Sequence, residues 1–258
     1  MKKDVRRVRE IVTNENKCIL ANVCSLAGTE SCTNLCEHYV SIHGYNDNGG
    51  RVRSAQIPLD YRTVTLQNSP ARENQSRLYA TLERYAETFK RRFTGDSEPI
   101  KSAYLYSKNP GTGKTTSAVA LLNEWVKIDY MGSIKYGKRP SMLPAYFLDV
   151  NEFQTKHNLA TMTSDEKELE EIKDVINICR NVEFLVMDDI GLRNATDSFR
   201  SYVHAIVNHR TTYGKPTVYT SNLPIEDMAS VFDERLYDRM NDRCVQLHFK
   251  GESNRGGI

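Results

Sequence analysis

The stretch that decides the fold is KNPGTGKTT, residues 108–116. It follows a short apolar run at 103–106 and opens a segment with helical periodicity that extends to about residue 127. Glycines in such a loop let backbone amides turn toward phosphate oxygens, and the lysine that follows them reaches the β and γ phosphates of a nucleotide. The threonine after that lysine supplies a hydroxyl that can ligate Mg²⁺. The stretch therefore predicts a phosphate-binding loop between a strand and a helix.

One position departs from the usual pattern GxxxxGK[ST], because Lys108 stands in place of the first glycine. We expect this side chain to constrain the start of the loop or to add positive charge near the nucleotide. A glycine turn without function is disfavoured, since the loop lies directly between a strand pattern and a helix pattern. The residues predicted to bind nucleotide are Asn109, Pro110, Gly111, Thr112, Gly113, Lys114, Thr115 and Thr116, with Thr115 also a magnesium ligand.

Outward from the loop, short apolar runs alternate with helical patterns. The patterns predict strands at 103–106, 146–150, 184–187, 217–220 and 245–249, and helices at 114–127, 165–180 and 197–213. Strands separated by helices of this length indicate βαβ units and a mostly parallel sheet with helices on both faces. The predicted fold class is α/β.

A second motif, EFLVMDDIG at 183–191, is an apolar strand that ends in two acids. Downstream of a phosphate-binding loop, Asp188 is predicted to hold Mg²⁺ and Asp189 to polarise the attacking water. The second acid of this motif is usually a glutamate. Because the aspartate is one methylene shorter, we expect hydrolysis to be slow.

Two further motifs carry candidate catalytic residues. PTVYTSNLP at 216–224 is a strand pattern followed by Asn222, which can orient the lytic water or, equally on spacing alone, be a turn residue before a proline. In DERLYDRMNDR at 233–243, Arg235 and Arg239 lie four residues apart on one helical face. An arginine there can act on the nucleotide of a neighbouring subunit, although such a face is more often only solvated.

The N-terminal residues contain a cysteine cluster in a loop-rich segment. Cysteines in a chain without a secretory leader favour metal ligation over disulfides, and thiolates with imidazoles favour Zn²⁺. Buried free thiols are the alternative. The predicted ligands are Cys18, Cys24, Cys32 and Cys36, with His38 as a substitute.

Between the cysteine cluster and the first strand, apolar spacing predicts one helix from Pro70 to about Gly95. The segment TGDSEP at 94–99 is the best candidate boundary. We therefore expect a cysteine-rich, zinc-binding module at 1–68, a helical linker at 69–98 and a nucleotide-binding domain at 99–258.

Composition narrows the location and partners of the chain. Its 258 residues contain no apolar run of the roughly 18 to 20 residues that a membrane span needs, and the basic start lacks the apolar stretch of a signal peptide. We therefore expect a cytoplasmic protein without a membrane partner. The net charge of +2 is too small to imply nucleic-acid binding by itself, so such contacts must come from local patches.

Together these motifs resemble the AAA+ ATPases, and among them the DnaC/DnaI helicase-loader group with its IstB-like relatives. The resemblance covers residues 99–258 and rests on NPGTGKTT, LVMDDIG, YTSN, ERLYDRM and the tail FKGESNRG with Gly251, Ser253 and Arg255. It implies that Asn222 is the sensor-1 residue, that Arg239 is the arginine finger, and that the helical lid of larger AAA+ proteins is absent. The cysteine-rich N-terminal residues look like the head with which DnaI-type loaders grip the helicase.

The resemblance implies an ATPase that uses ATP and Mg²⁺ to load a hexameric replicative helicase of the DnaB type in the initiation of DNA replication. It further implies binding of single-stranded DNA and a homo-oligomer with ATP sites between subunits. Two alternatives remain open: an IstB-like helper of transposition, and a nucleotide-gated adaptor with little hydrolysis.

Overall fold

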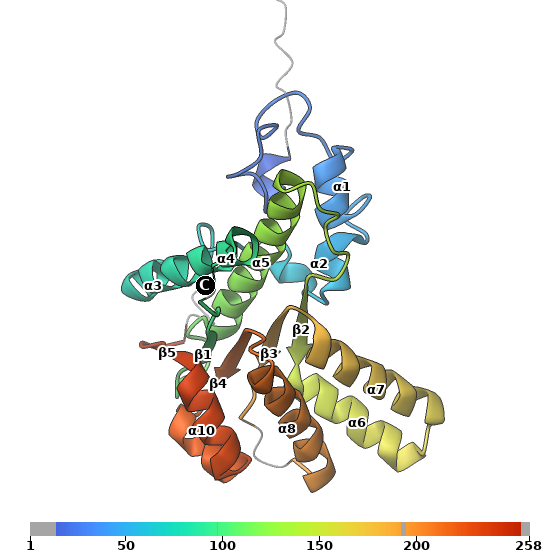
Figure 1. Cartoon of the computed structure of the whole chain (residues 1–258), viewed down its shortest axis with the longest axis vertical. Coiled ribbons are helices and arrows are strands. Elements are labelled where there is room, and N and C mark those ends of the chain that lie inside the picture. The colour runs from blue at the N-terminus through green and yellow to red at the C-terminus, as the bar shows by residue number, and fades with distance from the viewer. Residues whose placement is uncertain (1–13, 97, 192–194, 254–258) are drawn as a thin grey trace, which may run out of the picture.

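The computed structural model describes residues 14–96, 98–191 and 195–253. Five parallel strands form one sheet in the order β2-β3-β4-β1-β5 (Figure 1). Helices connect the strands along the chain, so the predicted α/β fold is confirmed. The strands are β1 (Ser102–Tyr106), β2 (Ala145–Asp149), β3 (Phe184–Asp188), β4 (Thr217–Ser221) and β5 (Cys244–His248).

The two faces of the sheet are covered by different helices, because successive side chains of a strand point to opposite faces. On one face, Leu105 and Val186 belong to a core that includes α5 (Lys114–Lys135). On the other, Tyr104 and Leu185 belong to a second core. The helices that cover this second face are α6 (Val150–Thr163), α7 (Glu166–Asn181), α8 (Asp197–Thr212), α9 (Met228–Val231) and α10 (Glu234–Arg243). Within the described ranges, no helix is long and apolar enough to cross a bilayer.

The described residues before β1 share the core of α5. Ile19, Ile42 and Val52 are buried in the same cluster as that helix, and Figure 1 shows α1 and α2 beside its far half. The amide of Phe147 in β2 donates a hydrogen bond to the carbonyl of Ala55 at 2.8 Å. The short helices of this region are η1 (Glu15–Lys17), α1 (Glu37–His43), α2 (Gly50–Ser54), η2 (Leu59–Tyr61), α3 (Ser76–Glu87), η3 (Thr88–Lys90) and α4 (Arg91–Thr94).

Two differences from the predicted helices affect the residues around the site. The helix expected from Pro70 begins only at Ser76, because the hydroxyl of Ser69, the residue before that proline, bonds to the phenol of Tyr79 at 2.5 Å and so offers no N-cap there. Helix α6 was not predicted. It begins directly after β2, where the Asp149 side chain caps it by accepting the amide of Glu152 at 2.9 Å.

Candidate nucleotide site

The register of the strands brings polar residues together at the carboxyl edge of the sheet. Asp149 at the end of β2 lies opposite Asp188 at the end of β3. A cavity of about 440 Å³ opens at this edge, which is where open α/β sheets bind ligands. Among the predicted residues, those that line it are Pro110, Gly111, Gly113, Lys114, Thr115, Thr116, Asp188, Asp189 and Asn222.

Lys114 lies in the first turn of α5 and is largely buried. Its Nζ donates hydrogen bonds to Oδ1 of Asn222 at 2.8 Å and to the carbonyl of Asn109 at 3.2 Å. The preceding Gly113 has a φ of 96°, and a Cβ there would collide with the side chain of Ala71, so only glycine fits. This geometry holds the ammonium at the cavity, where it adds positive charge for a phosphate group.

Asp188 is held between two hydroxyl groups. Thr115 Oγ1 donates to its Oδ2 at 3.1 Å, and Thr220 Oγ1 donates to its Oδ1 at 2.6 Å. Burial raises the pKa of Asp188 to about 6, while these two hydrogen bonds act in the opposite direction. A carboxylate beside a threonine hydroxyl supplies the hard oxygen donors that Mg²⁺ prefers, so the residues fit this ion.

Asp189 is oriented by three polar groups. Its φ of 60° lies in the left-handed region, and its amide donates to Thr220 Oγ1 at 2.8 Å. The Nδ2 of Asn151 donates to its Oδ2 at 2.7 Å, and the Nδ2 of Asn222 donates to its Oδ1 at 3.3 Å. Both carboxylate oxygens therefore accept amide hydrogen bonds, and Asn222 connects this carboxylate to Lys114.

Six cavity residues were not predicted from the sequence. Asp149 is the last residue of β2 and Asn151 lies two residues further on, and a position at a strand end is the same signal that marked Asp188 and Asn222. Thr220 lies two residues before Asn222 in the motif PTVYTSNLP, but it falls inside the strand pattern, where nothing marks a threonine as a site residue. The full set of cavity residues outside the prediction is Tyr61, Pro70, Ala71, Asp149, Asn151 and Thr220.

Two residues of the loop do not line the cavity. Thr112 is buried, and its hydroxyl donates to the carbonyl of Asn109 at 3.5 Å. The side chain of Asn109 instead donates from Nδ2 to the carbonyl of Gly251 at 2.9 Å. Both residues support the loop from outside the cavity.

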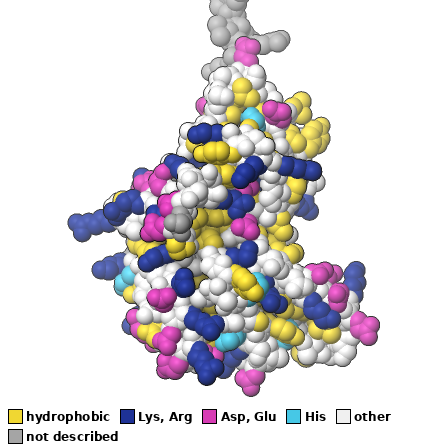
Figure 2. Space-filling view, in the orientation of Figure 1, with side chains coloured by type: hydrophobic (Ala, Val, Ile, Leu, Met, Phe, Trp, Pro, Cys, Tyr) yellow, Lys and Arg dark blue, Asp and Glu magenta, His cyan; other side chains and the backbone are white. Residues whose placement is uncertain are grey.

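The two candidate arginines lie on the exposed face of α10, away from this cavity. Leu236 and Met240 of the same helix are buried, so the turn spacing leaves Arg235 and Arg239 on the outer face. Neither arginine lines the nucleotide cavity of its own chain. On the face seen in Figure 2, basic and acidic side chains are interspersed, in keeping with a net charge of +2.

The cysteines of the N-terminal cluster lie together. Cys18, Cys24, Cys32, Cys36 and His38 line one cavity of about 10 Å³. Burial raises the pKa of the Cys18 thiol to about 11, and the other three cysteines contribute in the same direction. Nδ1 of His38 bonds to the phenol of Tyr130 in α5 at 3.0 Å. Among the described residues, no group of three His, Cys, Asp or Glu side chains is arranged to hold a metal, so the structure does not support the zinc prediction.

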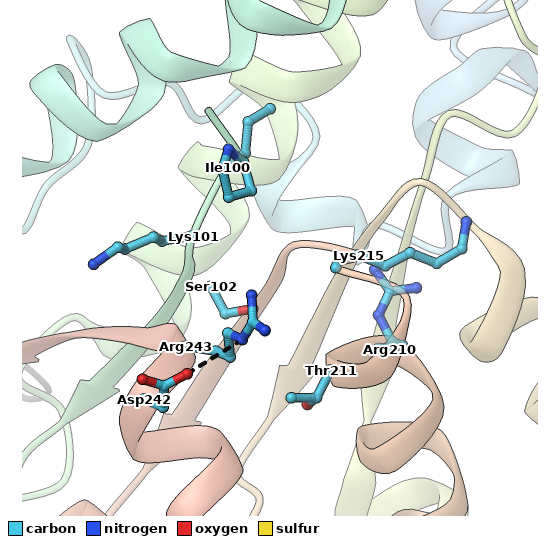
Figure 3. Close-up of a pocket in the computed structure, with 10 residues that line it drawn as sticks. Ile100, Lys101, Ser102, Arg210, Thr211, Lys215, Asp242 and Arg243 are labelled. Atoms are coloured by element: carbon cyan, nitrogen blue, oxygen red, sulfur yellow. Dashed lines mark ion pairs between the residues drawn. The ribbon is translucent and has the colours of Figure 1, made fainter. Parts of the chain in front are cut away.

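A second cavity of about 240 Å³ lies at the amino edge of the sheet, and its residues are shown in Figure 3. Arg210 in its wall is fully buried and donates to the carbonyls of Cys179 at 2.8 Å and Val182 at 2.7 Å. Burial lowers the pKa of this guanidinium to about 10. The Nζ of Lys215 likewise donates a hydrogen bond to the carbonyl of Asn181 at 2.8 Å. Through these hydrogen bonds the two side chains connect the residues before β4 to the end of α7, so they have a structural role in the fold.

The parallel sheet, the loop after β1 and the acids at the end of β3 define the class of the protein as an α/β fold of the P-loop type. No family model matches the chain. It is 25% identical over 202 residues to the replicative helicase loader DnaC of Escherichia coli strain K12. The matched region covers 74% of this chain and 76% of that relative.

Solved structures show the same fold. A crystal structure of the DnaC helicase loader matches with a TM-score of 0.53 and 21% identity, over 75% of this chain and all of that one. A crystal structure of DnaI matches with a TM-score of 0.53 and 19% identity, over 75% of this chain and 95% of that one. The chain is thus similar to the DnaC/DnaI group of AAA+ proteins, as its motifs predicted.

Proposed function

We propose that the chain is an ATP-dependent loader of a hexameric replicative DNA helicase that acts in the initiation of DNA replication. Its similarity to DnaC over 74% of the chain supports this role. The observation that carries the proposal is the hydrogen-bond network that joins Lys114, Asn222 and Asp189. It places a cation that can bind phosphate and a carboxylate that can act as a base on either side of one amide group, an arrangement that suits hydrolysis of a nucleoside triphosphate.

In this proposal Lys114 and the amides of the loop bind the β and γ phosphates of ATP. Thr115 and Asp188 would hold Mg²⁺, which supplies positive charge to the phosphate oxygens when bound. The hydrogen bonds that Lys114 now makes to Asn109 and Asn222 keep its ammonium in place before the nucleotide arrives. The wall formed by Tyr61, Pro70 and Ala71 is left for the base and sugar.

Hydrolysis is assigned to Asp189 and Asn222. Asp189 accepts the proton of the attacking water, and Asn222 orients that water beside the γ-phosphate. Asn151 and Asn222 fix the two carboxylate oxygens at 2.7 and 3.3 Å, so the base is held in one orientation. We expect slow turnover, because an aspartate reaches less far into the cavity than a glutamate would.

The arginines of α10 are assigned to a neighbouring subunit. Arg239 lies on an exposed helix face and does not line the cavity of its own chain. A homo-oligomer with ATP sites between subunits would bring Arg239 to the next nucleotide, with Arg235 as the second choice. A guanidinium supplied in trans stabilises the charge that develops on the transferred phosphate.

The helicase and single-stranded DNA are the proposed partners. We assign the helicase contact to residues 1–68, of which residues 14–68 are described, and the nucleotide-binding domain to 99–258 with a helical linker at 69–98. A structural zinc in the cysteine cluster stays a prediction, and metal analysis decides it.

A loading assay tests the proposal. A hexameric helicase of the DnaB type is mixed with the protein, ATP and circular single-stranded DNA, and the helicase retained on DNA is measured. Wild-type protein should increase the amount of helicase retained on the DNA. The Lys114→Ala protein should not bind nucleotide and should not load helicase. ATP binding and loading without turnover would favour the adaptor alternative. Absence of helicase binding by a folded, ATP-binding protein would refute the loader assignment.

A further inference from the structure

The residues that follow β5 cross the phosphate-binding loop. Phe249 is fully buried, and its amide donates to the carbonyl of Tyr106 at 2.8 Å, which keeps the chain beside the end of β1. The next four residues, 250–253, we call the tail segment. They lie against the loop that connects β1 to α5.

Two side-chain amides hold the tail segment from opposite directions. From the loop, Nδ2 of Asn109 donates to the carbonyl of Gly251 at 2.9 Å. From the start of α3, Nε2 of Gln75 donates to the carbonyl of Lys250 at 2.6 Å. Gln75 is largely buried and does not line the nucleotide cavity. The tail segment therefore bridges the loop and the residues that precede α3.

Gly111 shows how closely the tail segment approaches. A Cβ on Gly111 would collide with the side chain of Ser253 and lie 3.2 Å from its Cα. The φ of Gly111, 72°, also lies in the left-handed region. Glycine is therefore needed at this position for two reasons, the turn of the loop and the space taken by Ser253.

The tail segment supports the part of the loop that departs from the usual pattern. Lys108 replaces the first glycine, and the next residue, Asn109, is held on both sides. Lys114 Nζ donates to the carbonyl of Asn109 at 3.2 Å. The side chain of Asn109 donates in turn to the carbonyl of Gly251. The conformation of residues 109–111 is thus stabilised by Lys114 within the loop and by the tail segment from outside it.

We propose that residues 250–253 are positioning residues for nucleotide binding. They hold residues 109–111 so that the amides of the loop already point toward the phosphate site. This inference rests on the proposed ATP binding. A loop that must be ordered by the ligand binds more weakly than one ordered in advance, so loss of the tail segment should lower nucleotide affinity.

Two truncated chains and one substitution test the inference. One chain ends at Ser253 and keeps every described contact, whereas the other ends at Phe249 and loses the tail segment. The substitution Gln75→Leu removes one anchor without changing the loop or the cavity. Each protein is titrated with ATP and with ADP in Mg²⁺, and thermal unfolding is measured without nucleotide.

The chain that ends at Phe249 loses the hydrogen bonds from both Asn109 and Gln75, and it should bind both nucleotides about tenfold more weakly. Gln75→Leu loses only one of these bonds and should bind about threefold more weakly. The KM for ATP should rise while kcat stays unchanged, because Asp189 and Asn222 keep their partners. The chain that ends at Ser253 should bind like the full chain.

Wild-type affinity in both the Phe249 truncation and Gln75→Leu would overturn the inference. If the truncated chain does not fold, unchanged affinity in folded Gln75→Leu overturns it alone. Weak binding by the chain that ends at Ser253 would assign the effect to residues 254–258 and also overturn it. Failure of the full chain to bind nucleotide would instead refute the proposed ATP binding, so the two failures are distinguishable.

Discussion

Replacing Thr220 with valine tests whether its hydroxyl organises both acids of the site. The side chain is about 1% exposed, donates to Asp188 Oδ1 at 2.6 Å and accepts from the amide of Asp189 at 2.8 Å. Valine has nearly the same shape, so the change removes both hydrogen bonds without opening a cavity. A hydrogen bond to a charged group contributes about 1.5–3 kcal/mol, and a buried amide without an acceptor costs about 1–3 kcal/mol.

We therefore expect Thr220→Val to lower the free energy of unfolding by about 3 kcal/mol near neutral pH. The matched control is Thr220→Ser, which keeps both hydrogen bonds and loses one methyl group, for a loss of about 1 kcal/mol. Urea unfolding of the nucleotide-free proteins measures both values. ATP turnover should fall further in the valine variant than in the serine variant. A valine variant as stable as the serine variant would refute the reasoning.

Three other outcomes follow from the site and the N-terminal residues. Arg239→Ala chains should bind ATP normally and hydrolyse it poorly, and turnover should return on mixing with Lys114→Ala chains; no recovery in proven mixed assemblies would exclude action in trans. Burial lowers the pKa of His43 from 6.5 to about 4, so the unfolded state takes up its proton first as pH falls. His43 contributes stability above pH 6.5 that is lost toward pH 4, about 2 kcal/mol between pH 7.5 and pH 5. Urea unfolding should show it as the difference between wild type and His43→Gln, because the raised pKa of Asp188 acts in the opposite direction over the same range. Elemental analysis of protein purified without chelator should find about one zinc per chain if the cysteines ligate it, and less after Cys32→Ser; a zinc-free protein would contradict that prediction.

Much of the site could be predicted because its residues stand at strand ends along the chain. The parallel register places the ends of β1, β3 and β4 at one edge of the sheet, so Lys114, Asp188 and Asn222 meet there although more than 30 residues separate each from the next. Local sequence is sufficient for such residues. It gives the strand, the residue after it, and the chemistry of its side chain.

The rest depends on contacts that no local pattern reveals. Asn151 reaches Asp189 only because α6 begins without a connecting loop after β2, and this helix has weak amphipathic periodicity. Ala71 forms a cavity wall because Ser69 bonds to Tyr79 and delays the start of α3. Each of these placements is decided by a partner distant in sequence or by the suppression of a helix that the spacing favoured.

The position of α5 gives the N-terminal residues a direct connection to the nucleotide site. The helix begins at Lys114 in the phosphate-binding loop and is buried along most of its length. Further along it, Asn123 donates to the carbonyls of Tyr61 at 3.0 Å and Val64 at 2.7 Å, and Tyr130 bonds to His38. A closely packed helix transmits a displacement of one end to its neighbours at the other, because its side chains have little free space. If the helicase binds residues 14–68 as proposed, it contacts a region that packs against the helix beginning in the phosphate-binding loop, and α5 would then connect the two sites.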